Sequence, residues 1–135
     1  MLFIRLVFFT NLFKVYYDAG FPEKFATDYR ESAKMNKPMI TYGYGMTLAR
    51  HKRQEGFKLY SEGKLKETID SFLELLSIYR EIKRDSGLVA THFSLGVLYE
   101  EKGDTIKANE SFLNVLEINP DHLQARERIK ALKTK

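Results

Sequence analysis

Three pairs of identical residues recur at a spacing of 40 positions in the second half of the chain. The pairs are Gly56 with Gly96, Gly63 with Gly103, and Phe72 with Phe112. Internal repetition with a period of a few tens of residues is typical of repeat architectures, in which one supersecondary unit is used again. We therefore expect the backbone to turn and dock in the same way twice between residues 49 and 120.

The second unit predicts two antiparallel helices. Glycine enters the left-handed conformation at low cost, so Gly103 is expected to end the first of them, and Asp104 or Thr105 to cap the next. That second helix is expected to stop before Pro120. Apolar residues, with one histidine, recur at helical spacing in both helices: Leu88, His92, Leu95 and Tyr99, then Ile106, Ala108, Phe112, Val115, Leu116 and Ile118.

The first unit follows the same logic with a longer second helix. Apolar residues recur there at spacings of three and four from Leu65 to Ile82. We expect this helix to reach about Asp85 and Ser86-Gly87 to break it. After the second unit, a final helix over residues 121–133 is expected to pack Leu123, Ile129 and Leu132 inward, while its basic residues stay in solvent.

This pattern resembles the tetratricopeptide repeat family. The second unit carries the resemblance through Leu95-Gly96, Tyr99, Gly103, Ala108, Phe112 and Pro120, and the first through Gly56, Gly63 and Phe72. The first unit departs at Leu59 and Thr68, where the family usually has tyrosine and alanine. The resemblance implies an all-α, TPR-like α-solenoid of stacked antiparallel hairpins, with repeats over residues 49–87 and 88–120 and a capping helix with a basic tail over residues 121–135.

The N-terminal third starts with a strongly apolar run, MLFIRLVFFTNLFKVYY, over residues 1–17. It is short for a membrane span, which needs about 20 apolar residues, and it lacks the basic start and cleavage site of a secretory signal. Three interpretations stay open: a helix packed on protein, membrane contact, or a cleaved leader. The first two require a partner surface. The residues expected at that contact are Phe3, Ile4, Val7, Phe8, Leu12 and Phe13.

The remaining domain assignments concern residues 1–48. Residues 1–38 are expected to form the hydrophobic helix and a degenerate helical hairpin. Asn36-Lys-Pro38 indicates a break after that hairpin, because proline disfavours a helical residue before it. Residues 39–48 are then expected to act as a connector, with Tyr42-Gly-Tyr-Gly45 giving a flexible entry to the first repeat helix.

The sequence offers no constellation that points to catalysis. It contains no cysteine, which excludes disulfides, thiolate nucleophiles and thiolate metal sites. Its three histidines, His51, His92 and His122, lie far apart and lack the spacing of a zinc pair. We therefore predict that the protein is not an enzyme and needs no cofactor or metal, and that His92 is a packed structural residue.

The resemblance implies that the protein binds other proteins. In the family, the first helix of each hairpin lines a concave groove for a peptide or a partner helix. Family members that bind chaperone tails clamp a terminal carboxylate, but Phe57 and Ser94 stand where that clamp has asparagines, so this ligand is not expected. The groove residues carried over are Arg50, Arg53, Phe57, Tyr60, Phe93, Val97, Glu100, Gln124 and Glu127.

The predicted function is a non-catalytic protein–protein interaction scaffold, acting as a structural or assembly subunit of a larger, membrane-bound or soluble complex. The alternative is a soluble adaptor that binds a peptide or helix in its groove. An RNA-associated protein is a more distant alternative, favoured by the basic stretch from Arg50, but the sequence has no base-reading motif. Neighbouring subunits are thus the expected partners, and nucleic acid is not. The location stays open between membrane-associated or organellar (mitochondrial) and cytoplasmic.

Overall fold

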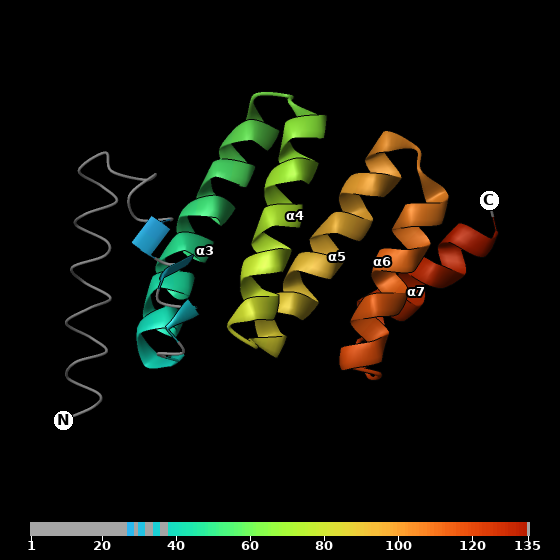
Figure 1. Ribbon diagram of the computed structural model, residues 1–135. Helices are drawn as coiled ribbons and strands as arrows, with labels where there is room; N and C mark the ends of the chain where they lie inside the picture. Colours follow the sequence, from blue (N-terminus) through green and yellow to red (C-terminus); the bar gives the residue numbers. More distant parts are fainter. Residues whose placement is uncertain (1–26, 29, 32–33, 36–37, 135) are drawn as a thin grey trace. The chain divides into compact units, whose positions relative to one another are not determined.

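The computed structural model describes residues 27–28, 30–31, 34–35 and 38–134, and within them it is all-helical (Figure 1). The helices are α3 (Pro38–Ser61), α4 (Leu65–Glu81), α5 (Asp85–Lys102), α6 (Thr105–Ile118) and α7 (Leu123–Lys133). None of the described helices is long and apolar enough to cross a membrane. The hydrophobic helix expected over residues 1–17, with its contact residues Phe3 to Phe13, lies outside the described residues.

The chain divides into two compact units, Met1–His51 and Lys52–Lys135, and α3 crosses the division. In the first unit, the helical state of residues 39–48 contradicts the expected connector. The break at Asn36-Lys-Pro38 is consistent with the start of α3 at Pro38, where the missing N–H of proline has no helical partner to lose. Gly43 and Gly45 are buried in this helix, so packing outweighs their low helix propensity.

The turns after α3 and α5 have the same backbone geometry. Gly63 and Gly103 both adopt the left-handed conformation, with φ of 76° and 86°. The N–H that follows each glycine reaches back five residues, from Lys64 to the Leu59 carbonyl at 3.0 Å and from Asp104 to the Tyr99 carbonyl at 2.9 Å. This pairing is the Schellman motif, which satisfies the last carbonyls of a helix. The expectation that Gly103 ends its helix is confirmed.

The turn between α4 and α5 has the same hydrogen bonds without a glycine. Lys83 takes the left-handed conformation with a φ of 55°, and the N–H of Arg84 donates to the Tyr79 carbonyl at 3.0 Å. The expected break at Ser86-Gly87 is therefore wrong, because α4 ends at Glu81 and α5 begins at Asp85. Gly87 is instead buried in the first turn of α5, where a Cβ atom would collide with the ring of Tyr79.

The helices of the two hairpins dock through equivalent glycine–phenylalanine contacts. A Cβ atom on Gly56 would lie 2.8 Å from Cε2 of Phe72, and one on Gly96 would lie 2.5 Å from Cε1 of Phe112. Only a residue without a side chain lets these rings press against the facing helix. Phe72 and Phe112 are both buried, so each ring fills the space that its glycine leaves.

The C-terminal part confirms the expected caps and corrects two apolar positions. The Asp104 carboxylate accepts a hydrogen bond from the Lys107 N–H at 3.1 Å, and α6 ends at Ile118, before Pro120. Helix α7 buries Ala125 and Ile129. However, the side chains of Ile106 and Leu123 are 73% and 66% exposed. Both lie in the first turn of their helices, where no neighbouring helix covers them.

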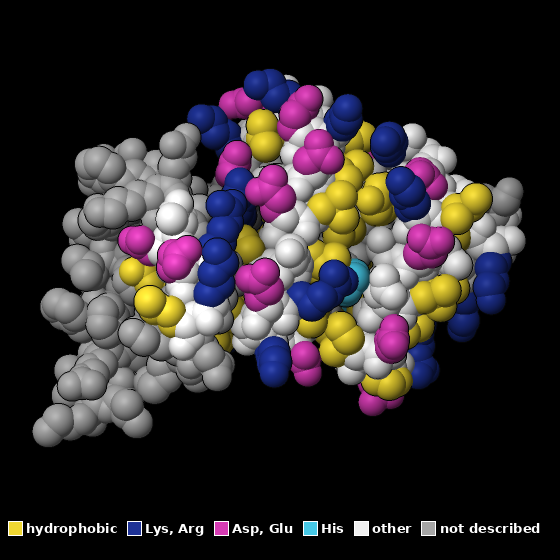
Figure 2. Space-filling model, viewed as in Figure 1, with side chains coloured by type: hydrophobic (Ala, Val, Ile, Leu, Met, Phe, Trp, Pro, Cys, Tyr) yellow, Lys and Arg dark blue, Asp and Glu magenta, His cyan; other side chains and the backbone are white. Residues whose placement is uncertain are grey.

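Figure 2 shows one face of residues 52–134, on which basic and acidic side chains are interspersed over the helices. Hydrophobic side chains gather over α5, between α4 and α6.

The docking contact gives a stability prediction. Gly96→Ala is expected to lower the free energy of unfolding by about 1–3 kcal/mol, because the added methyl group overpacks against the fully buried Phe112. Intrinsic helix propensity alone favours alanine by about 1 kcal/mol. Urea unfolding measures the change. The exposed position Asn114→Ala on α6 is the control and should not destabilise; a Gly96→Ala protein as stable as the wild type would refute the contact.

His92 gives a pH prediction. Burial lowers its pKa below the usual 6.5, the positive charge of Arg80 adds to this, and Glu117 opposes it. The unfolded chain therefore binds the His92 proton at a higher pH than the folded protein does. This contribution to stability is complete above about pH 6.5 and is lost as the pH falls from there toward the lowered pKa.

We expect the stability difference between the wild type and His92→Gln to shrink from pH 7.5 to pH 5, as measured by urea unfolding at each pH. An NMR titration of the His92 ring should have its midpoint below 6.5. A midpoint at or above 6.5 would contradict the burial of an uncharged imidazole.

Candidate functional site

An open, largely apolar surface lies between α3 and α5, with α4 as its floor. It consists of two adjoining depressions of about 300 and 280 Å³ that share Phe57, Phe72 and Ser94. We call it the α3–α5 groove. Its lining residues are Arg53, Phe57 and Tyr60 from α3; Thr68, Phe72, Leu75 and Tyr79 from α4; and Ala90, Thr91, Phe93, Ser94, Val97, Leu98 and Glu101 from α5.

Helices α3 and α5 run in the same direction along this groove. Arg53 shares one depression with Ala90 and Thr91, near the start of α5, whereas Tyr60 reaches Glu101, near its end. Residue numbers therefore increase in the same direction along both walls of the groove. This orientation follows from the repeat, since both helices are the first member of their hairpin.

Phe57 is the most exposed aromatic side chain of the groove, at 57%. Its neighbour Gly56 faces inward against Phe72, so Phe57 turns outward on the helix. Its ring meets the Phe72 ring edge-on, with the centroids 5.8 Å apart and the planes at 75°. One face of Phe57 is thus fixed by the core, while the remainder is open to a ligand.

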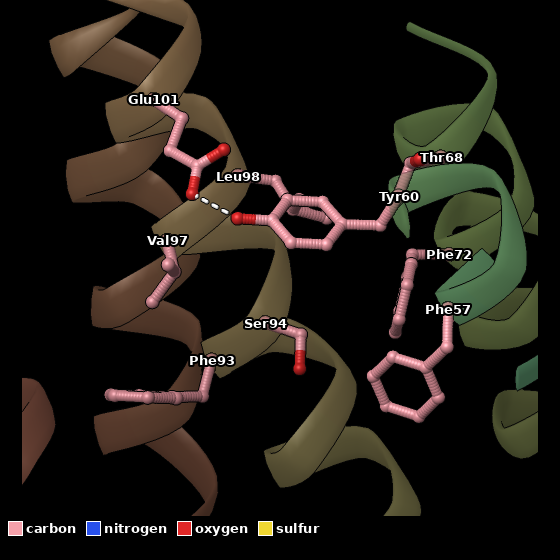
Figure 3. A pocket seen from close by; sticks show the side chains of 9 residues that line it. All are labelled: Phe57, Tyr60, Thr68, Phe72, Phe93, Ser94, Val97, Leu98 and Glu101. Carbon is pink, nitrogen blue, oxygen red and sulfur yellow. Dashed lines mark hydrogen bonds between the residues drawn. The ribbon is translucent and has the colours of Figure 1, made fainter. Parts of the chain in front are cut away.

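Tyr60 crosses the upper end of the groove (Figure 3). Its hydroxyl donates a hydrogen bond of 2.6 Å to Oε1 of Glu101, which links the two walls. This hydrogen bond, followed by the negative charge of Glu101, raises the pKa of Tyr60 above 10.0. The tyrosine is 46% exposed, so it forms an apolar wall even though its hydroxyl is engaged.

Lys52 fixes the position of α3 against α4. Its ammonium group lies 2.8 Å from Oε2 of Glu74 and 3.3 Å from Oε2 of Glu55. Burial alone would lower its pKa, but the hydrogen bond to Glu74 and the charge of Glu55 outweigh that effect, so the pKa is raised. The lysine therefore stays charged at neutral pH and holds the helix that carries Phe57.

A third depression, of about 490 Å³, lies beside α7 and is more polar. It is lined by Phe93, Gln124, Glu127, Arg128 and Ala131. Phe93 separates it from the α3–α5 groove, with its ring 5.5 Å from that of Phe112 and 5.3 Å from that of His122. His122 also accepts the Ala125 N–H at 3.1 Å through Nδ1 and so caps α7.

The structure brings most of the predicted groove residues together. Five of them line the α3–α5 groove, and Gln124 and Glu127 line the third depression with Phe93. Glu100 lines none of these depressions. Its side chain is 17% exposed and accepts a hydrogen bond from Arg128 at 3.2 Å. Arg50 belongs to the other compact unit and is not placed with this surface.

Sequence reasoning missed Glu101 and Arg128. Glu101 lies one helical turn after Val97, so the four-residue spacing from Phe93 through Val97 pointed to it rather than to Glu100. Arg128 adjoins the predicted Glu127, but no sequence pattern indicates its pairing with Glu100, 28 positions away. Such a long-range ion pair depends on tertiary placement.

The Tyr60–Glu101 bridge gives a titration prediction. Because the folded pKa of Tyr60 is raised, the bridge stabilises the protein below about pH 10 and is lost as the pH rises through the folded pKa. Glu101→Gln should return the pKa of Tyr60 toward 10, as followed by NMR of ¹³C-labelled tyrosine. Tyr60→Phe identifies the resonance. An unchanged midpoint in Glu101→Gln would show that the two side chains are not bonded in solution.

In the part of the chain that the structure describes, no three His, Asp or Glu side chains come together so as to hold a metal ion. No protein-family model matches the chain, and no curated protein does either. The geometry of the α3–α5 groove is therefore the basis on which a function is assigned.

Proposed function

We propose that this protein is a TPR-like interaction module that binds a segment of another protein in the α3–α5 groove and performs no catalysis. The observation that carries the proposal is the pair of aromatic side chains, Phe57 and Tyr60, held open on one wall of an apolar groove. Aromatic residues supply much of the energy of protein interfaces, and they do so best from fixed positions in well-packed surroundings.

The duplicated geometry supports the TPR-like part of the proposal. Two Schellman turns and two glycine–phenylalanine contacts recur 40 positions apart, so each hairpin presents its first helix to the same side. A stack of such hairpins places the first helices along one shared face. The departure at Thr68 fits this geometry, since Thr68 is fully buried, and its hydroxyl donates to the Lys64 carbonyl at 2.7 Å.

Membership of a larger assembly is the second part of the proposal. It rests on the amino-acid sequence of residues 1–17, which is too apolar to remain in contact with water. A chain with one strongly apolar segment and a separate groove has two means of attachment. The protein then acts as an assembly subunit, fixed by one segment and holding a neighbouring protein in the groove.

The groove is tested by replacing its aromatic wall. The double variant Phe57→Ala/Tyr60→Ala should weaken partner binding by about 30-fold or more, which corresponds to about 2 kcal/mol for a typical interface hot spot. The measurement is co-purification of the tagged full chain with its partners, quantified by mass spectrometry. The fold should persist by circular dichroism, because both side chains are largely exposed.

Leu113→Ala is the matched control. Leu113 is an exposed apolar residue on α6 that lines none of the three depressions, so its replacement removes apolar surface without altering the groove. It should retain the co-purified proteins. If the same proteins co-purify with the Phe57/Tyr60 double variant in the same amounts as with the wild type, the binding surface lies elsewhere.

A further inference from the structure

The α3–α5 groove follows the axis of α5. The α5 residues that line it run from Ala90 to Glu101. The eleven rises of α-helix between these two residues correspond to a length of roughly 17 Å, or about three turns. Ala90, at the start of this path, and Ser94, one turn later, carry small side chains that leave room for a ligand beside the ring of Phe57.

Four of the hydroxyl groups that line the groove already donate hydrogen bonds within the chain. Thr68 donates to the Lys64 carbonyl, Thr91 to the Gly87 carbonyl and Ser94 to the Ala90 carbonyl, at 2.7, 2.7 and 3.0 Å. Tyr60 donates to Glu101. An extended peptide would therefore find few donors for its backbone carbonyls beyond Arg53 at one end of the groove, and burying carbonyls unpaired is costly. A helix satisfies its own backbone and needs only apolar contact.

The two ends of the groove carry opposite charges. Arg53 lies at the end near Ala90, and its guanidinium forms no ion pair among the described residues. Glu101 lies at the other end, where one carboxylate oxygen accepts the Tyr60 hydroxyl. A helix carries partial positive charge at its N-terminus and partial negative charge at its C-terminus. The groove therefore distinguishes the two directions in which a helix can lie.

We infer that the groove binds an amphipathic helix of about three turns that lies antiparallel to α3 and α5, with its N-terminus at Glu101 and its C-terminus at Arg53. Apolar side chains at positions i, i+3 or i+4, and i+7 of this helix enter the groove. A basic side chain near its N-terminus meets Glu101, and an acidic one near its C-terminus meets Arg53. This inference rests on the proposed function and adds the conformation, direction and charge pattern of the partner.

The experiment uses a phage-displayed library of 15-residue peptides, randomised at every position, selected on the full-length protein. We expect peptides with an apolar stripe at helical spacing, a base in the first third and an acid in the last third. Arg53→Glu should weaken their binding by about tenfold, because a repulsion of about 0.7 kcal/mol replaces an attraction of about 0.7 kcal/mol. Lys58→Glu, an equally large charge change outside the groove lining, should leave the affinity within about twofold.

A second selection on Arg53→Glu should return peptides with a base in the last third, and one on Glu101→Lys should return an acid in the first third. Because Glu101→Lys also removes the bond to Tyr60, Tyr60→Phe measures that loss alone. A nitroxide on the peptide N-terminus should broaden the amide signal of Glu101 more than that of Arg53, and a nitroxide on the C-terminus should do the reverse.

The outcomes separate this inference from the proposed function. Two outcomes would leave the groove as the binding site but overturn this inference. If the selected peptides depend on Phe57 but bind in an extended form, the helical conformation is wrong. If they bind as helices in the opposite direction, the orientation is wrong. The same charge pattern from the wild type and from Arg53→Glu would overturn the role of the end charges. If no selected peptide depends on Phe57, the groove itself is refuted, and the proposed function falls with this inference.

Discussion

The contact of a phenylalanine ring with a glycine on the facing helix determines how each hairpin closes. Without a Cβ on Gly56 or Gly96, the rings of Phe72 and Phe112 reach the backbone of the opposite helix and are buried. This close approach also sets the rotation of the first helix. With glycine turned inward, the next residue must turn outward, so the open position of Phe57 in the groove is a result of core packing.

The sequence predicted those features that depend on short-range geometry. Gly103 and Gly63 mark left-handed turns, Asp104 is a cap, and Pro120 follows the end of α6, because each acts through its own backbone or that of near neighbours. The spacing of 40 added the tertiary information that the two hairpins close alike. Five of the residues that line the groove were carried over from the resemblance to the tetratricopeptide repeat family.

The errors arose where tertiary packing outweighed local preference. Ser86-Gly87 has the composition of a break, yet Gly87 serves to admit the ring of Tyr79, and Lys83 takes the left-handed conformation that glycine normally adopts. Residues 39–48 contain two glycines and are helical all the same, because both are buried. Glu100 was expected to face a ligand, but Arg128 from the last helix engages it. Local composition predicts none of these tertiary contacts.

Phe72 belongs to two parts of the molecule at once. One side of its ring closes the first hairpin against Gly56, and another side forms the floor of both depressions in the groove. A substitution there changes folding and recognition together, so the two properties cannot drift independently during evolution. The second hairpin lacks this coupling in the groove, because Phe112 is enclosed. Variation in recognition at constant stability is therefore more accessible from α5 than from the first hairpin.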